Sequence, residues 1–330
     1  MPQKYDVAGL GNAIMDVIAS VDDEFLLTHQ IAKGAMTLID EFRAQELHKQ
    51  LSGGVEVAGG SAANTMAGLA SLGAATVFSG KVYDDRLGGA FGASLKSLGV
   101  EYTTLPAKTG SPTASCMIAV TPDGQRSMNT YLGACREMTP DDVQAEEIAA
   151  AKILYIEGYL WDTDDAKDAA RKAIAAARKG GAQVSLSLSD SFCVGRFRDE
   201  FLALMADHLD ILFANEDEAK ALFEEEEFGA VVKKFKAWGG IAAITRSADG
   251  CVVIKGDDVH YVPAAPVAEV VDTTGAGDQF AAGFLFGMTH GKSLDDCGRL
   301  GSLAAAEVIS HYGARPETSL KALAQKAGLI

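Results

Sequence analysis

Strand-like and helix-like segments alternate regularly through the second half of this 330-residue sequence. Short apolar runs are separated by longer segments rich in Ala, Lys and Glu, the pattern typical of β-α units. Such units form a mostly parallel sheet with helices on both faces, and ligands are expected at the carboxyl ends of its strands. The four strand candidates are 153–158, 183–189, 211–214 and 241–245.

The first half contains further β-α units and one interruption. An apolar strand from Val7 runs into a loop that reaches Asp16, and a second unit follows at 76–98. Residues 113–120 and 126–132 instead flank a Pro-Asp-Gly turn, which predicts an antiparallel hairpin. We expect this hairpin to join the extended segment 33–40 in a small β lid. The lid segments would lie within about 17–58 and 103–136 of a single α/β domain, 1–330, whose main sheet ends in an edge hairpin at 251–262.

Composition excludes several classes of function. The net charge of −16, from 45 acidic and 29 basic residues, disfavours a nucleic-acid-binding surface. The five cysteines are scattered, with no C-x-x-C pair, which favours buried free thiols in a reducing compartment. No apolar run reaches the ~18 residues of a membrane span, and the N-terminus lacks the apolar core of a signal peptide. We therefore expect a soluble, cytoplasmic protein.

The stretch Val271-Asp-Thr-Thr-Gly-Ala-Gly-Asp278 predicts an anion site. Asp272 and Thr273 close an extended segment, and Gly275 and Gly277 form a turn ahead of an apolar helix. Unpaired N–H groups and the helix dipole favour a phosphate there. Asp278 in the first turn could serve as a proton acceptor beside it, although such a residue can also merely compensate the dipole.

Polar residues elsewhere follow predicted strands. Asn12 and Asp16 lie beyond the first strand, and Asn64 lies in the first turns of a small-residue helix after Gly59-Gly60. These residues could contact a ligand, or they could be ordinary loop residues and close-packing positions. A dinucleotide fingerprint is disfavoured because Ile14 occupies its third glycine position.

Polar residues that follow two later strands also have both a structural and a functional interpretation. Asn215 and Glu218 fit a helix capping box, and they also fit Mg²⁺ held through waters. Thr245 and Arg246 follow the next strand, and Arg126 after the lid turn could reach an anion or be solvated.

Taken together, these motifs resemble the ribokinase (PfkB-type) family of carbohydrate and nucleoside kinases. Residues 272–278 resemble its C-terminal signature, and residues 59–64 followed by 80–88 resemble its N-terminal one. The resemblance extends from about Tyr5 to Pro316. It implies a ribokinase-like three-layer α/β sandwich, with a central mostly parallel sheet and a small β-stranded lid.

The resemblance also implies a role for each candidate residue. Asp278 would be the catalytic base, with Gly275, Ala276 and Gly277 as the anion hole and Arg126 assisting. The sugar hydroxyls would be bound by Asn12, Asp16, Gly60, Ser61 and Asn64. ATP would be bound by Asn215, Thr245, Arg246, Gly250, Thr274, Gly275 and Gly277. Mg²⁺ would be held mostly through water by Glu218, and a monovalent cation such as K⁺ would lie near Asp272 and the turn at Gly313. One departure is Ser247, where relatives commonly have glycine.

Within the family, the chain is most similar to the adenosine kinase branch. The resemblance places the acceptor base against apolar walls, here Met36, Met128, Leu132, Tyr159 and Leu160. The predicted reaction transfers the γ-phosphoryl group of ATP to the 5′-hydroxyl of adenosine, by a monomer or a homodimer. The alternatives are a kinase for another nucleoside or for a free sugar such as ribose or fructose, and a nucleoside-binding sensor without catalysis.

Overall fold

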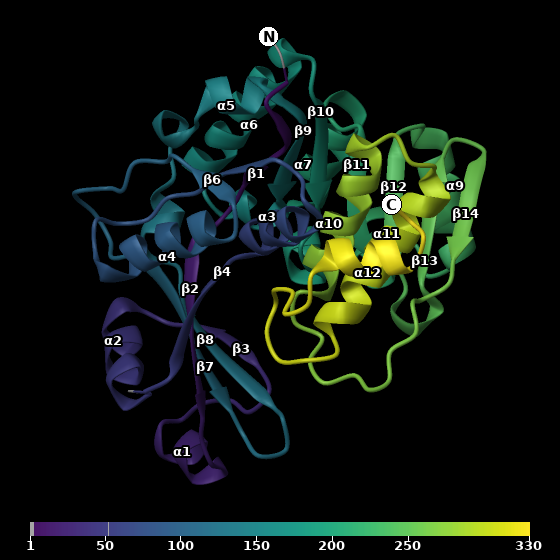
Figure 1. Cartoon of the computed structure of the whole chain (residues 1–330). Coiled ribbons are helices and arrows are strands. Elements are labelled where there is room, and N and C mark those ends of the chain that lie inside the picture. The colour runs from purple at the N-terminus through teal and green to yellow at the C-terminus, as the bar shows by residue number, and fades with distance from the viewer. Residues whose placement is uncertain (1–2, 52) are drawn as a thin grey trace.

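The computed structural model describes residues 3–51 and 53–330, and within them the strands form a nine-stranded main sheet and a five-stranded small sheet (Figure 1). The main sheet is parallel from β12 to β6, and β13 and β14 extend it as an antiparallel hairpin. The four strands and the edge hairpin predicted for the second half are confirmed. In spatial order the main sheet consists of β14 (Asp258–Val262), β13 (Cys251–Lys255), β12 (Ile241–Thr245), β11 (Ile211–Asn215), β10 (Gln183–Ser187), β9 (Ala151–Glu157), β1 (Tyr5–Leu10), β5 (Thr76–Ser79) and β6 (Val100–Tyr102).

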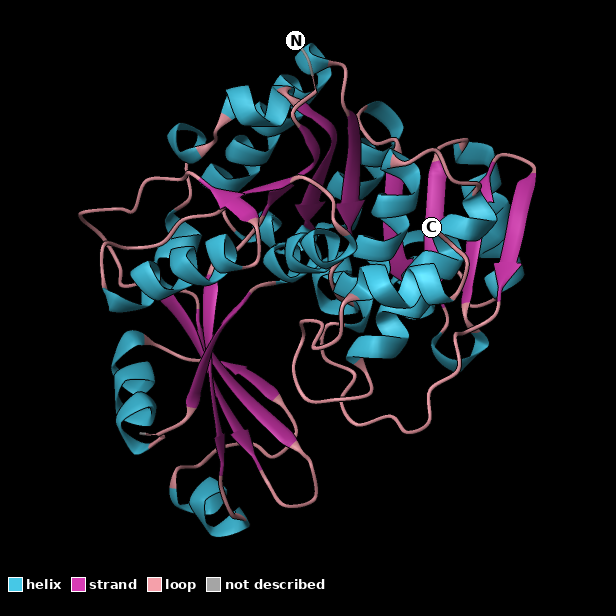
Figure 2. Cartoon of the chain, viewed as in Figure 1, coloured by secondary structure: helices cyan, strands magenta, loops and turns pink. Residues whose placement is uncertain are grey.

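Helices cover both faces of the main sheet (Figure 2). Alternate residues of β9 show why: Leu154 and Ile156 belong to one hydrophobic core, and Ile153 and Tyr155 belong to the other. The first core is closed by α5 (Ala145–Ala149), α6 (Asp164–Gly180), α7 (Ser191–Asp207), α8 (Glu216–Phe223) and α9 (Phe228–Trp238). The second is closed by α3 (Ser61–Leu72), α4 (Arg86–Ser97), α10 (Ala276–Thr289), α11 (Leu294–Val308) and α12 (Leu320–Lys326). The predicted three-layer α/β arrangement is confirmed.

The small sheet projects from the body (Figure 1). Its spatial order is β3 (Met36–Leu38), β8 (Arg126–Tyr131), β7 (Ala114–Val120), β2 (Ile14–Ser20) and β4 (Val55–Gly59). β7 and β8 are antiparallel and β3 pairs with β8, as the sequence predicted. Val17 and Met117 pack on one face of this sheet beneath α1 (Asp23–Thr28) and α2 (Glu41–Gln50). The other face carries exposed apolar side chains.

One local prediction of secondary structure was wrong. Asp16 does not lie in a loop but inside β2, because the chain turns after Leu10 and enters the small sheet at Ile14. Residues 263–273 form no strand, and the Asp272 carboxylate accepts hydrogen bonds from the N–H groups of Thr274 and Gly313.

Short 3₁₀ segments connect several elements, namely η1 (Gly133–Glu137), η2 (Pro140–Asp142), η3 (Gly158–Asp162) and η4 (Ser247–Asp249). The five cysteines are buried free thiols, as predicted. Across the described residues, no helix combines the length and apolar character needed to cross a bilayer.

Candidate active site

The glycine turn before α10 forms a helix N-terminus that faces open space. Gly275 caps the helix at a φ of 79°, in the left-handed region that favours glycine, and a Cβ there would crowd Ala314. The Ala276 N–H donates to the carbonyl of Thr273 at 3.2 Å. The N–H groups of Gly277 and Asp278 begin the helix and have no intrahelical acceptor, and a Cβ on Gly277 would meet nothing within 4 Å. This arrangement suits an approaching anion.

The Asp278 carboxylate is held by α3. Its Oδ1 accepts a hydrogen bond from Ser61 Oγ at 2.6 Å, and its Oδ2 accepts one from Asn64 Nδ2 at 3.1 Å. Burial raises the pKa of Asp278 to about 6, although the hydrogen bonds from Ser61 and Asn64 oppose this rise. Asp278 is therefore mostly ionised at neutral pH and able to accept a proton.

Glu157, which the sequence analysis missed, joins the segments around Asp278. Its Oε1 accepts the backbone N–H of Asn12 at 2.8 Å, and its Oε2 accepts that of Ala62 at 2.8 Å. The side chain is completely buried, and burial raises the pKa of Glu157 to about 7. The residue thereby ties the loop after β1 to the start of α3.

Backbone packing completes this cluster. Gly60 has a φ of 90°, and a Cβ there would collide with the carbonyl oxygen of Asn12. Gly59 in turn leaves room for the Asp16 carboxyl. Burial raises the pKa of Asp16 to about 6, against the nearby charges of Arg315 and Arg126. The structure thus brings the predicted residues Asn12, Gly60, Ser61 and Asn64 to one place with Asp278 and Asp16.

Arg126 is engaged differently from its predicted catalytic role. Its guanidinium donates to Asp272 Oδ2 at 2.8 Å, and the two side chains are only 9% and 5% exposed. Asp272 also accepts from the Gly313 N–H at 3.0 Å and from the N–H and hydroxyl of Thr274. Burial alone would raise the pKa of Asp272, but these hydrogen bonds and the Arg126 charge hold it below its ordinary value. These donors occupy both carboxylate oxygens of Asp272, and the monovalent cation near Asp272 and the Gly313 turn stays a prediction.

A second group of predicted residues lies at the ends of β11 and β12. Asn215 and Thr245 are register partners on these neighbouring strands. Asn215 and Glu218 form the predicted capping box, with Glu218 only 6% exposed. Burial raises the pKa of Glu218 to about 7, and both its oxygens accept hydrogen bonds from Asn215. Glu218 is therefore poorly placed to bind Mg²⁺ directly.

The loop after β12 is well ordered by its own contacts. Arg246 Nε donates to Glu216 at 2.6 Å, and its guanidinium lies over the Phe228 ring at 4.4 Å. Ser247 has a φ of 50°, in the left-handed region that favours glycine. Gly250 has a φ of 83°, and a Cβ there would collide with the carbonyl of Val262. No cluster of three or more His, Cys, Asp or Glu suited to a metal occurs among the described residues.

The five residues predicted to form apolar walls around the acceptor base do not all lie in the same environment. Met36 and Met128 are register partners in the small sheet, and Leu132 follows β8 and is half-buried. Burial raises the pKa of the half-buried Tyr159, and the charges of Asp190 and, more weakly, Asp278 act in the same direction. The prediction for Leu160 was wrong, because this side chain points into the core of the main sheet and is 1% exposed.

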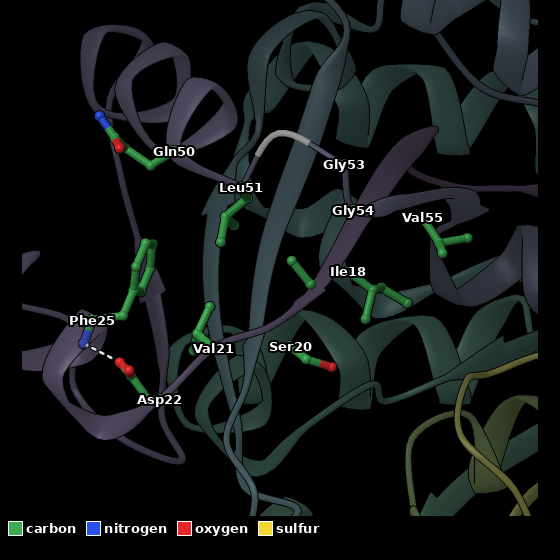
Figure 3. Close-up of a pocket in the computed structure, with 11 residues that line it drawn as sticks. Ile18, Ser20, Val21, Asp22, Phe25, Gln50, Leu51, Gly53, Gly54 and Val55 are labelled. Carbon is green, nitrogen blue, oxygen red and sulfur yellow. Dashed lines mark hydrogen bonds between the residues drawn. The ribbon is translucent and has the colours of Figure 1, made fainter.

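A cavity of about 740 Å³ lies in the small sheet between β2, β4 and the adjoining ends of α1 and α2 (Figure 3). Ile18, Val55 and Phe25 contribute its apolar lining, and Asp22 caps α1 beside it by accepting the Phe25 N–H. None of the predicted site residues lines this cavity, so it is distinct from the cluster around Asp278.

Comparisons with known proteins agree with this geometry. The model of the pfkB family of carbohydrate kinases matches residues 30–321, and the chain belongs to this family. A crystal structure of a probable sugar kinase from Rhizobium etli CFN 42 is 49% identical, with a TM-score of 0.92 over 99% of this chain and 100% of that one. The structure of adenosine kinase from Sinorhizobium meliloti is 50% identical, with a TM-score of 0.90 over 98% of this chain and 99% of that one. Adenosine kinase 1 of Arabidopsis thaliana is 28% identical over 330 residues, 92% of this chain and 94% of the relative.

The family and fold confirm the predicted ribokinase-like architecture. The chain is an ATP-dependent kinase of the PfkB family with adenosine kinase-like or sugar kinase activity. This agrees with a carboxylate placed beside a helix N-terminus, an arrangement suited to phosphoryl transfer to a hydroxyl.

The sequence analysis missed three residues that organise the site: Glu157, Gln279 and Arg315. Gln279 Nε2 donates to the carbonyls of Asn64 and Ala314, which joins α3 to the turn after α11. The signal for Glu157 was a lone acid at the end of an apolar strand, and the signal for Gln279 was a lone amide at the start of an apolar helix. Arg315 gave no signal beyond its place in a turn.

Proposed function

We propose that this chain transfers the γ-phosphoryl group of ATP to the 5′-hydroxyl of adenosine, yielding AMP and ADP. The observation that carries the proposal is the Asp278 carboxylate, held by Ser61 and Asn64 directly beside the first-turn N–H groups of α10. A base and an anion site lie together there, with Asn12 and Asp16 close by as hydroxyl partners.

The chemistry follows from this placement. Asp278 accepts the proton of the acceptor hydroxyl as that oxygen bonds to the γ-phosphorus, and the bond to the bridging oxygen of ADP breaks. The N–H groups of Gly277 and Asp278, with the helix dipole, stabilise the charge on the transferred group. A carboxyl with a pKa near 6 is ionised at neutral pH yet more basic than an exposed aspartate.

The nucleotide is proposed to lie along the ends of β11 and β12, against Asn215, Thr245, Arg246, Gly250 and Thr274. Mg²⁺ is proposed to enter as the MgATP complex, coordinated mainly by phosphates and water. Glu218 would act on it at most through water, since its oxygens are already bonded to Asn215.

The small sheet supports a nucleoside over a bare sugar. One row of register partners crosses its uncovered face and is entirely apolar: Val55, Ile18, Ile118, Met128 and Met36. Val55 and Met36 are 65% and 53% exposed. In a sheet, residues two apart share a face, so Asp16 lies on the same face as Ile18. A purine placed against this row would leave the ribose beside Asp16, and its burial would contribute a few kcal/mol, about the value for an aromatic side chain.

The test measures ADP formation with adenosine, ribose and fructose as acceptors, for the wild type and for Asp278→Asn. We expect the highest kcat/KM for adenosine, and we expect Asp278→Asn to lower kcat by about 10²–10⁴-fold while largely keeping acceptor binding. Asp296→Asn is the matched control, because Asp296 occupies the same first-turn position in α11 and its carboxylate accepts a hydrogen bond from Ser293 Oγ. Normal turnover in Asp278→Asn would remove it as the base.

The second candidate is a sugar kinase, supported by the likeness to the probable sugar kinase of Rhizobium etli. A kcat/KM for ribose or fructose equal to that for adenosine would favour this candidate, and the kinase assignment would stand.

A further inference from the structure

Arg315 lies in the turn between α11 and α12, with its guanidinium directed at α3 and α4. Its Nε donates to Asn64 Oδ1 at 3.1 Å, and its Nη1 donates to Ser94 Oγ at 3.3 Å. Its Nη2 is buried and has no hydrogen-bond partner among the described residues. No carboxylate forms a direct ion pair with Arg315 in the described part of the chain, so its charge acts on Asp278 and Asp16 from a short distance.

The turn that carries Arg315 is fixed to the start of α10. Gln279 Nε2 donates at 2.9 Å to the carbonyl of Ala314 and at 3.0 Å to that of Asn64. The Gly313 N–H donates to Asp272 at 3.0 Å. Arg315 is therefore held in place relative to both Asn64 and Asp278.

We propose that Arg315 is a positioning residue for the base Asp278: its guanidinium orients the Asn64 amide toward that carboxylate, and its charge keeps the carboxylate ionised. An amide side chain can present either its oxygen or its nitrogen to a neighbour, whereas a guanidinium only donates. Arg315 therefore requires Asn64 Oδ1 on its side, which turns Nδ2 toward Asp278 Oδ2 at 3.1 Å. Without Arg315 the amide can turn over and place its oxygen against the carboxylate.

The charges around Asp278 make this contribution important. Glu157 and Tyr155 of β9 and Tyr159 of η3 face Asp278, and none of them supplies a positive charge. Asp16 of β2 faces Arg315 from the small sheet and is also near Arg126. Burial raises the pKa of Asp278, and after the hydrogen bonds from Ser61 and Asn64 the Arg315 charge lowers it. Burial lowers the pKa of Arg315 itself to about 10, so it remains charged at neutral pH.

The inference rests on the proposed role of Asp278, and its test follows kcat/KM for adenosine between pH 5.5 and 9 with saturating MgATP. We expect Arg315→Gln to move the acidic limb of the profile upward by about one pH unit, the lower end of the effect of one nearby charge. With the pKa of Asp278 moved from about 6 to about 7, activity would fall about fivefold near pH 6 and recover substantially near pH 8.5. Arg315→Lys keeps the charge, so we expect its acidic limb near the wild-type position but a lower kcat, since lysine reproduces the contact with Asn64 poorly.

Ser94→Ala is the control, because it removes the other hydrogen bond of the guanidinium and keeps the charge. A loss by the same factor at every pH in Arg315→Gln would indicate a merely structural role and overturn the inference. If Arg315→Gln fails to fold, Arg315→Lys decides, and a wild-type kcat in that variant overturns the orienting role. If Asp278→Asn is inactive and the acidic limb of the Arg315→Gln profile is unshifted, this inference alone is refuted. If Asp278→Asn is active, the proposed role of Asp278 as the base is refuted as well.

Discussion

Replacing Glu157 by glutamine tests whether this buried carboxyl holds the site together. Its two oxygens accept the N–H groups of Asn12 and Ala62, each at 2.8 Å. Glutamine keeps the shape but offers only one oxygen, so one of these N–H groups would face an amide donor. An unpaired buried donor costs about 1–3 kcal/mol of the free energy of unfolding.

The pH dependence of this loss can be derived from the pKa of Glu157. Burial raises the pKa of Glu157 from 4.5 to about 7, so ionisation costs more in the folded than in the unfolded chain. The stability associated with its neutral form is fully present below pH 4.5 and is lost as the pH rises through 7. A rise of this size corresponds to about 3 kcal/mol. Because glutamine does not titrate, the disadvantage of Glu157→Gln should shrink by about 2–3 kcal/mol between pH 5 and pH 8.

The assay is urea unfolding of the wild type and of Glu157→Gln at pH 5, 6, 7 and 8, with kcat/KM measured on the same samples. Glu269→Gln is the control, since Glu269 is an exposed carboxylate in the loop before α10. We also expect Glu157→Gln to lower kcat/KM about tenfold or more, because Ala62 follows Ser61, which holds Asp278. A stability difference that stays constant over this pH range would refute the argument from buried ionisation.

Two further predictions concern packing. Leu160→Ser should lower the free energy of unfolding by about 2–5 kcal/mol, as for other large-to-small changes in a core, and should leave KM for adenosine little changed, whereas Leu132→Ser should raise that KM. Denaturation and steady-state kinetics would distinguish the two variants. A raised KM in a stably folded Leu160→Ser variant would return Leu160 to the acceptor site. Gly277→Ala should leave the melting temperature nearly unchanged because the added Cβ meets open space, yet it should lower kcat because the Cβ obstructs the anion. Gly60→Ala should lower both the melting temperature and kcat, since the Gly60 backbone has a φ of 90°. Equal thermal stability of the two alanine variants would contradict this reasoning.

Features encoded by neighbouring residues were predicted well. The glycine turn before α10, the capping box at Asn215 and the hairpin of β7 and β8 each depend on contacts a few residues apart. Asp16 was assigned to the wrong element because the chain passes from one sheet to the other within three residues, which no turn motif marks. Leu160 was misplaced because its side chain is buried in the core, whereas that of the adjacent Tyr159 in η3 is only half-buried.

Features that depend on distant residues were not predictable from local patterns. Arg315 meets Asn64 and Ser94 from 251 and 221 residues away in the sequence, and Arg126 meets Asp272 from 146 residues away. The sequence drew attention to Arg126 and Asp272 but could not pair them, and it drew no attention to Arg315. Arg126 was therefore expected to meet a bound anion or solvent, whereas the structure pairs it with the Asp272 carboxylate.

These distant pairs also explain how a chain with a net charge of −16 can serve an anionic nucleotide. Net charge governs the long-range field, which is screened within about 8 Å at physiological ionic strength, whereas binding depends on groups within a few ångströms. The N-terminus of α10 supplies partial positive charge at the proposed phosphate position, and Arg126 and Arg315 balance the carboxylates of Asp272, Asp16 and Asp278 around it. The acidic composition therefore argues against nucleic acid, which needs an extended basic surface, but not against ATP, which needs only this local arrangement.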